Sequence, residues 1–174
     1  MAFEAGFNAI VDRFAESVYN HAWRMLGSPE DAEEATQDVF LRVHGSLDSF
    51  RGDAKISTWI WRITTNVCLS RRSAKRDSMK RSENLSGSDD VPDDSRGPEA
   101  AYIESEERER LGRLIATLPD GEASAITLYY MQGFDYNEIA EVLCIPPGSV
   151  ATALHRGRDR LRSMLEGTTR QVKE

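Results

Sequence analysis

Residues 135–162 read DYNEIAEVLCIPPGSVATALHRGRDRLR. Asp135 and Glu138 have the spacing of a capping box, which predicts the start of a short helix. The Pro-Pro-Gly run that follows cannot continue that helix, so a second one is expected to begin at Gly148 or Ser149. A short helix, a tight turn and a longer basic helix form the pattern of a helix-turn-helix.

The second helix of this motif has an apolar face and a polar face. Hydroxyl, imidazole and guanidinium groups near the start of a helix can reach base edges and phosphates in a major groove. The polar face presents Ser149, Thr152, His155, Arg156, Asp159 and Arg162. These side chains favour a DNA-reading helix, but an ordinary helical hairpin with a charged outer face has the same pattern.

Upstream of this motif, apolar residues recur at helical spacing. The spacings predict helices over 3–26, from a cap at Ser28 to about Gly45, from about Ser57 into a basic run, and over 121–132. A further apolar period ends at Pro119. Because no strand-like alternation extends beyond a few residues, we expect an all-α fold.

A polar stretch divides the chain. Residues 82–98 read SENLSGSDDVPDDSRGP, which has no apolar period and is rich in Ser, Asp, Gly and Pro. This composition is typical of a flexible acidic linker. We therefore expect two small helical bundles, an N-terminal domain over 1–81 and a C-terminal domain over 99–174.

The predicted third helix has two unlike sides. One side must be core, and it carries Ile56, Trp59, Ile60, Ile63 and Val67. The other is expected to face solvent, with Thr58, Trp61, Arg62, Thr65, Leu69, Arg72 and Arg76. An exposed aromatic ring beside arginines suits single-stranded nucleic acid, whose bases stack on such rings beside a cationic track. Packing of Trp61 against a neighbouring helix explains the pattern equally well, and Asn66 fits a plain surface amide.

Charge is unevenly distributed along the 174 residues, whose net charge is −7. Residues 55–81 carry 8 Lys or Arg against 1 acidic residue, and residues 148–174 carry 6 against 3. Residues 1–54 carry 4 against 10. Two basic segments in an acidic protein fit nucleic-acid binding at two places, or equally two solvated helix faces.

Enzyme motifs are missing from the sequence. His21, His44 and His155 are scattered, and no GxSxG or phosphate-binding loop occurs. We expect no catalysis, no cofactor, no metal and no small-molecule substrate. Cys68 and Cys144 have no CxxC partner and are interpreted as buried small hydrophobes. Without a signal peptide or a membrane span, a cytoplasmic protein is expected.

Several runs of the sequence resemble the extracytoplasmic function (ECF) sigma factors. In the N-terminal half these are DAEEATQDVFLRV at 31–43, LDSFRGD at 47–53 and STWIWRITTN at 57–66. In the C-terminal half they are LP at 118–119, YNEIAEVL at 136–143, IPPGSV at 145–150 and LHRGR at 154–158. Both halves occur in the family's order. The resemblance implies a promoter-specificity subunit of bacterial RNA polymerase.

The resemblance also implies which residues contact each partner. Docking on core RNA polymerase is expected of Glu34, Gln37, Asp38, Phe40 and Arg42. Melting and holding the −10 element of promoter DNA is expected of Arg51, Lys55, Ser57, Thr58, Trp61, Arg62, Thr65, Asn66 and Arg72. Reading the duplex −35 element is expected of Tyr136, Ser149, Thr152, His155, Arg156 and Arg158. An anti-sigma factor is the expected regulator.

The recognition helix departs from the family pattern. Basic residues usually stand in the family where this chain has Ala151 and Ala153. Their replacement implies weaker or differently specified −35 recognition, which relies on Ser149, Thr152, His155 and Arg156. Two other interpretations remain open: a stand-alone helix-turn-helix regulator, and an adaptor that binds polymerase without reading DNA.

Overall fold

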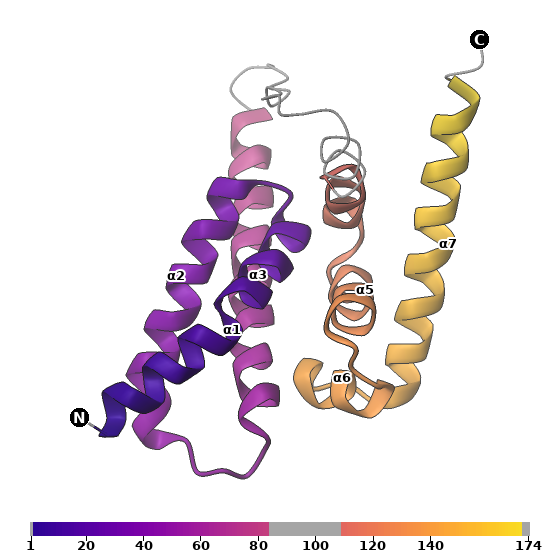
Figure 1. The fold of residues 1–174 in the computed structure, drawn as a ribbon. Coiled ribbons are helices and arrows are strands. Elements are labelled where there is room, and N and C mark those ends of the chain that lie inside the picture. Colours follow the sequence, from indigo (N-terminus) through magenta and orange to yellow (C-terminus); the bar gives the residue numbers. More distant parts are fainter. Residues whose placement is uncertain (1, 84–108, 172–174) are drawn as a thin grey trace, which may run out of the picture.

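The computed structural model describes residues 2–83 and 109–171, and within these two ranges it contains helices and short connections but no strand. The all-α prediction is therefore confirmed. In the N-terminal half, the helices are α1 (Ala2–Leu26), α2 (Pro29–Ser46), a one-turn 3-10 helix (Leu47–Ser49) and α3 (Ile56–Glu83). Figure 1 shows α1 crossing in front of α2 and α3.

The C-terminal half begins with a helical segment over residues 109–117. It continues with α5 (Asp120–Gln132), α6 (Tyr136–Leu143) and the long α7 (Pro147–Gln171). The predicted linker lies outside the described residues except for Ser82 and Glu83, which are the last residues of α3. The division into domains at 1–81 and 99–174 stays a prediction.

The helix starts follow local chemistry. Ser28 caps α2 by accepting a hydrogen bond from the backbone N–H of Asp31 at 3.2 Å. The predicted capping box of α6 is present, since Asp135 accepts from the N–H of Glu138 and Glu138 accepts from the N–H of Asp135. The start of α7 was expected at Gly148 or Ser149 but lies at Pro147, because proline lacks only an N–H that is unpaired in a first turn anyway.

Both halves contribute to one continuous hydrophobic cluster. Helices α1, α2 and α3 bury Val18, Ala22, Met25, Ala35, Val39, Val43, Ile60 and Val67. The C-terminal half buries Ile115, Leu118, Ile126, Leu128, Ile139, Val150 and Leu154. Helix α5 packs on α7, α6 packs on both α7 and α3, and α5 also packs on α1. The two halves therefore lie against each other rather than apart (Figure 1).

Close helix packing depends on glycines at two positions. A Cβ added to Gly157 of α7 would lie 2.9 Å from Cγ1 of Ile126 on α5. Gly27, which ends α1, has a φ of +75°, and its Cβ would lie 3.0 Å from that of Ala116. The first glycine permits the α5–α7 contact within the C-terminal half, and the second permits contact between the halves.

The two cysteines differ in their surroundings. Cys68 is buried as predicted, and burial raises the pKa of its thiol to about 12. The prediction of burial is wrong for Cys144, which is exposed at the end of α6 with a φ of 54°. Its position is a left-handed helix cap, a feature that glycine usually supplies.

Candidate functional site

Helix α2 presents the residues predicted to contact core polymerase. Glu34, Gln37 and Arg42 are exposed, whereas Asp38 and Phe40 are half-buried. The guanidinium of Arg71 on α3 lies 2.6 Å from the carboxylate of Asp38 and 2.8 Å from that of Glu34. This internal cation holds both acidic side chains and leaves Gln37 and Arg42 toward solvent.

Leu41 on the same helix was missed by the sequence analysis. Its side chain is 72% exposed, the largest fraction among the exposed large apolar residues that the structure describes. It lies one turn after Gln37 and outside the buried α2 stripe of Ala32, Ala35, Val39 and Val43. An apolar side chain that a helix turns to solvent is a candidate contact for another protein.

Helix α3 buries the side that was predicted to face solvent. Thr58 and Thr65 are each 2% exposed, and Trp61 is 3% exposed. We call Thr58, Trp61, Arg62, Thr65 and Arg72 the α3 stripe, because their spacing of three, four and seven places them along one helix face. The expectation of a solvent-facing side is wrong here because α1 and the C-terminal half both pack against α3.

Trp61 lies between the two halves of the chain. Its ring is 5.2 Å from that of His21 on α1 and 6.3 Å from that of Phe134, which follows α5. The Phe134 contact is edge-on, with an interplanar angle of 87°. The sequence left two interpretations open for Trp61: an exposed ring on which bases stack, and a ring packed against a neighbouring helix. The structure shows the packed ring.

The cations near Trp61 also have partners in the C-terminal half. Arg62 donates a hydrogen bond of 2.7 Å to the backbone oxygen of Glu141 on α6. Lys55, just before α3, lies 3.2 Å from the carboxylate of Glu138 at the start of α6. Both cations were predicted to contact DNA, and in this structure both contact α6.

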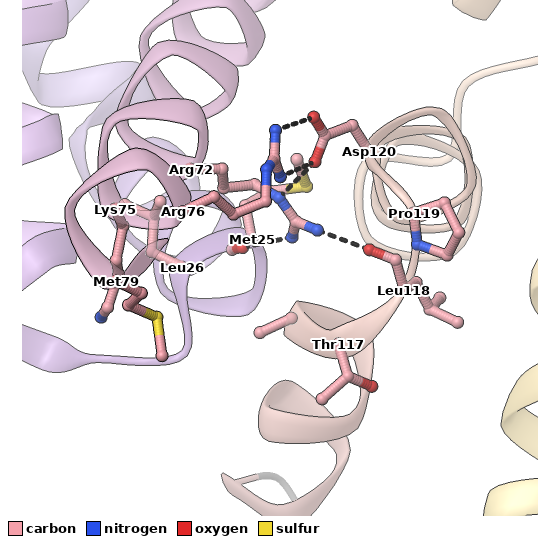
Figure 2. Close-up of a pocket in the computed structure, with 11 residues that line it drawn as sticks. Met25, Leu26, Arg72, Lys75, Arg76, Met79, Thr117, Leu118, Pro119 and Asp120 are labelled. Atoms are coloured by element: carbon pink, nitrogen blue, oxygen red, sulfur yellow. Dashed lines mark hydrogen bonds and ion pairs between the residues drawn. The ribbon is translucent and has the colours of Figure 1, made fainter. Parts of the chain in front are cut away.

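Arg72 makes the most buried of these contacts. Its guanidinium lies 2.7 Å from the carboxylate of Asp120, and it donates to the backbone oxygens of Met25 and Leu118. Arg76 donates two further hydrogen bonds to Asp120, each 2.8 Å long. Figure 2 shows both guanidinium groups directed at Asp120. The same three residues line a hollow of about 550 Å³.

Asp120 is ionised by these neighbours. The hydrogen bond from Arg76, followed by that from Arg72, lowers the pKa of the Asp120 carboxyl below its ordinary value.

The remaining residues of the predicted −10 set are more accessible than the buried members of the α3 stripe. Arg51 and Asn66 are exposed, and Ser57 is half-buried.

Helix α7 turns its predicted reading residues to solvent. Ser149, Thr152, His155 and Arg156 are all exposed. Thr152, His155 and Arg156 line a shallow hollow together with Ala151 and Asp159. Nδ1 of His155 lies 2.7 Å from the carboxylate of Asp159, a contact that orients the imidazole along the helix. The structure therefore brings these predicted residues together on one open face. We call Ser149, Thr152, His155 and Arg156 the α7 face.

Tyr136 and Arg158 form a second group. Tyr136 lies at the start of α6, with its ring 5.7 Å from that of Tyr129. A hydrogen bond with Tyr130 raises the pKa of the Arg158 guanidinium. Tyr130 is 50% exposed and was missed by the sequence analysis, since nothing in its spacing separates it from the core of α5. Arg158 therefore contacts a tyrosine of this second group, and it is not one of the residues that line the hollow with Arg156.

Ala151 and Ala153 occupy different environments. Ala151 is half-buried in the wall of the α7 hollow. Ala153 is half-buried and packs against the hydrophobic cluster.

Within 2–83 and 109–171, no group of His, Cys, Asp and Glu side chains could hold a metal ion. Over the same part of the chain, none of the helices has the length and apolar character that crossing a membrane requires.

Comparisons with family models match both halves. Residues 10–77 match the model described as Sigma-70 region 2. Residues 108–161 match the model described as Sigma-70, region 4. The two matches correspond to the helices that carry the α3 stripe and to those that carry the α7 face.

Whole-chain relatives give the same result. The chain is 34% identical over 165 residues to the ECF RNA polymerase sigma factor SigW of Bacillus subtilis (strain 168), covering 91% of this chain and 88% of the relative. It is 30% identical over 175 residues to the ECF RNA polymerase sigma-E factor of Escherichia coli (strain K12), covering 97% and 91%.

A solved structure shares the arrangement of helices. The sigma factor RpoE in complex with the anti-sigma factor NepR from Bartonella quintana has a TM-score of 0.69. The sequences are 18% identical, and the match covers 92% of this chain and 97% of that one. At this identity, the similarity shows the fold.

Proposed function

The chain belongs to the ECF RNA polymerase sigma factors, and we propose that it binds core RNA polymerase and directs initiation at specific promoters. The protein acts in the cytoplasm, where its polymerase and DNA are, and an anti-sigma factor controls it. As a transcription regulator it needs no catalytic residues of its own.

One observation carries this proposal for DNA recognition. Ser149, Thr152, His155 and Arg156 share an open face at the start of a helix-turn-helix second helix. Side chains at that position reach base edges when the helix enters a major groove. We assign duplex −35 recognition to this face within the proposed C-terminal domain, 99–174. We assign contact with the DNA sugar-phosphate backbone beside the −35 bases to Tyr136 and Arg158, which lie near Tyr130.

The proposed N-terminal domain, 1–81, supplies the other two interactions. Glu34, Gln37, Asp38, Phe40 and Arg42 form the polymerase-docking face of α2, to which we add Leu41. The α3 stripe, with Arg51, Lys55, Ser57 and Asn66, holds the melted −10 strand. Aromatic stacking on Trp61 beside Arg62 would stabilise an unpaired base by about 1–3 kcal/mol. The proposed linker, 82–98, lets the two domains reach separate promoter elements.

Size-exclusion chromatography with purified bacterial core RNA polymerase tests the docking assignment. Wild-type protein is expected to co-elute with the polymerase, and a Gln37→Ala/Leu41→Ser variant is expected to co-elute much less. Both changed side chains are exposed on α2, so the fold is retained. A Met79→Ser variant is the matched control, because Met79 is a 58% exposed apolar residue on α3.

The outcomes separate the assignments. Loss of co-elution in the α2 variant but not in the Met79 control supports the docking face. If wild-type protein fails to co-elute with a polymerase that accepts another sigma factor, the proposed function is wrong. If all three proteins co-elute equally, the docking face lies elsewhere.

A further inference from the structure

Ala151, His155 and Asp159 form one row along α7, because a spacing of four places side chains on the same helix face. All three line the shallow hollow on this helix, beside Thr152 and Arg156. The side chain of His155 is 72% exposed and that of Asp159 is 52% exposed. The imidazole therefore stands on the face that we propose to enter the major groove.

The contact between His155 and Asp159 fixes the position of one ring proton. Nδ1 of His155 lies 2.7 Å from Oδ2 of Asp159. An ionised carboxylate can only accept a hydrogen bond, so Nδ1 carries the proton and donates it. In the neutral imidazole the other nitrogen, Nε2, then keeps a lone pair and has no proton. His155 thus offers the DNA a hydrogen-bond acceptor.

The neighbours of this pair on α7 favour the same arrangement. Nη1 of Arg162 lies 3.8 Å from Oδ1 of Asp159, so one carboxylate oxygen faces a cation while the other faces the ring. Ala151, one turn before His155, is too short to cover the imidazole, and it brings no further cation to that turn. The ring is therefore held from one side and open on the other.

Base edges in the major groove fall into two classes for such an acceptor. Adenine and cytosine carry exocyclic amino groups, which donate hydrogen bonds. Guanine and thymine present carbonyl oxygens there, and an acceptor cannot bond to an oxygen that only accepts. An imidazole with its proton on Nδ1 therefore distinguishes the amino-bearing bases from the other two.

We propose that Asp159 is a positioning residue: it holds the proton of His155 on Nδ1, so that Nε2 selects adenine or cytosine at one position of the −35 element. This inference rests on the proposed function of the α7 face and extends it to the class of base that is read. Asp159 acts through His155 and contacts no base itself.

Substitutions at Asp159 separate this role from a general effect of charge. Asp159→Asn keeps the shape of the side chain, but an amide either accepts from Nδ1 or donates to it, so both proton positions become possible. Asp159→Glu keeps a carboxylate at the same spacing from His155 and should behave as wild type. The matched control is Glu166→Gln, which makes the same change in charge at an exposed position of the same helix.

The first measurement is long-range ¹H–¹⁵N correlation NMR of full-length protein labelled with ¹⁵N in its three histidines, which shows which ring nitrogen carries the proton. Spectra are recorded at about pH 8, because an imidazole takes up a second proton at lower pH. His155→Ala identifies the signals of His155. We expect the proton on Nδ1 in wild type, Asp159→Glu and Glu166→Gln, and on both nitrogens in exchange in Asp159→Asn.

The second measurement is selection from a duplex DNA pool of random sequence by core RNA polymerase carrying each full-length variant. The position at which wild type and His155→Ala differ is the one that His155 reads. There, wild type should favour adenine or cytosine about threefold to tenfold, the factor that one hydrogen bond contributes. Asp159→Asn should lose most of this preference, whereas Asp159→Glu and Glu166→Gln should keep it.

The outcomes separate this inference from the proposed function. A proton on Nε2 in wild type, or the same proton position in wild type and Asp159→Asn, would overturn the positioning role. Preference for guanine or thymine, preference retained in Asp159→Asn, or no position changed by His155→Ala would overturn the base assignment. A pool in which no sequence is enriched, with a polymerase that another sigma factor directs to promoters, would overturn the proposed function, whereas the NMR result would still decide where Asp159 holds the proton.

Discussion

The guanidinium of Arg72 on α3 and the carboxylate of Asp120 at the start of α5 lie 2.7 Å apart, Nε to Oδ1. The same guanidinium donates to the backbone oxygens of Met25 and Leu118. The side chain of Arg72 is 9% exposed. One buried cation therefore joins the end of α1, the start of α5 and the middle of α3.

Replacing Arg72 with alanine is expected to destabilise the protein by about 3 kcal/mol, because it leaves buried acceptors without their donor. Arg76→Ala is the control: Arg76 contacts the same carboxylate but is 48% exposed, and an exposed pair contributes about 0–1 kcal/mol. Urea unfolding followed by circular dichroism measures both. Equal losses in the two variants would contradict the role given to the buried guanidinium.

His21 is expected to make stability depend on pH. It is fully buried beside Trp61, and burial lowers its pKa to about 3, against an ordinary 6.5. Below pH 6.5 the unfolded chain takes up a proton that the folded chain excludes. The free energy of unfolding should therefore fall on acidification, by up to about 1.4 kcal/mol per pH unit, until the folded histidine titrates near pH 3.

A His21→Leu variant isolates this effect. Between pH 6.5 and pH 5, a range above the ordinary pKa values of carboxyl groups, its unfolding free energy should vary less with pH than that of wild-type protein. Urea unfolding at several pH values gives the comparison. The same slope in both proteins would show that His21 is not held neutral.

Gly157→Ala should weaken the contact between α5 and α7. The new Cβ would lie 2.9 Å from Cγ1 of Ile126 and 3.3 Å from its Cδ1, so one helix must shift. Overpacking of this kind costs about 1–3 kcal/mol. Gly121→Ala is the control, because its Cβ would meet no atom within 4 Å and alanine favours the helix. Thermal unfolding that ranks the two variants the other way would contradict the packing described.

Arg156→Ala should weaken promoter binding by the polymerase complex. If Arg156 contacts a base, the cost is about 1–3 kcal/mol and depends on the −35 sequence. Arg113→Ala removes the same charge from an exposed side chain outside the α7 face and should have little effect. Filter binding of the polymerase complex to promoter variants measures both. Unchanged binding across −35 variants would remove Arg156 from the reading set.

Local signals in the sequence were sufficient to predict the helices and their caps. Ser28 and the Asp135–Glu138 box act within one helical turn, so tertiary contacts do not decide them. The exposed α7 residues were also predicted correctly, because a single amphipathic period separates them from Val150 and Leu154. The start of α7 differed because Pro147 suits the first turn that it was expected to prevent.

Long-range packing was not predictable in the same way. The second side of the α3 helix mixes Trp61 with threonines and arginines, and such a side carries no local signal of what covers it. Trp61 could therefore be interpreted as exposed or packed. Its ring partner Phe134 lies far along the chain, as does Glu141, which accepts a hydrogen bond from the neighbouring Arg62. Leu41 was missed for the opposite reason, since an apolar residue on an acidic helix is expected to be buried until the structure shows it 72% exposed.

Transcription in vitro tests the central claim most directly. Core RNA polymerase would be incubated with fragmented genomic DNA from the source bacterium, with and without this protein, and the 5′ ends of the RNA would be mapped. The account predicts new start sites preceded by a shared −10 and −35 element. These starts should be lost with Gln37→Ala/Leu41→Ser and retained with Met79→Ser. RNA ends that are identical with and without the protein, using a polymerase that another sigma factor activates, would contradict the account.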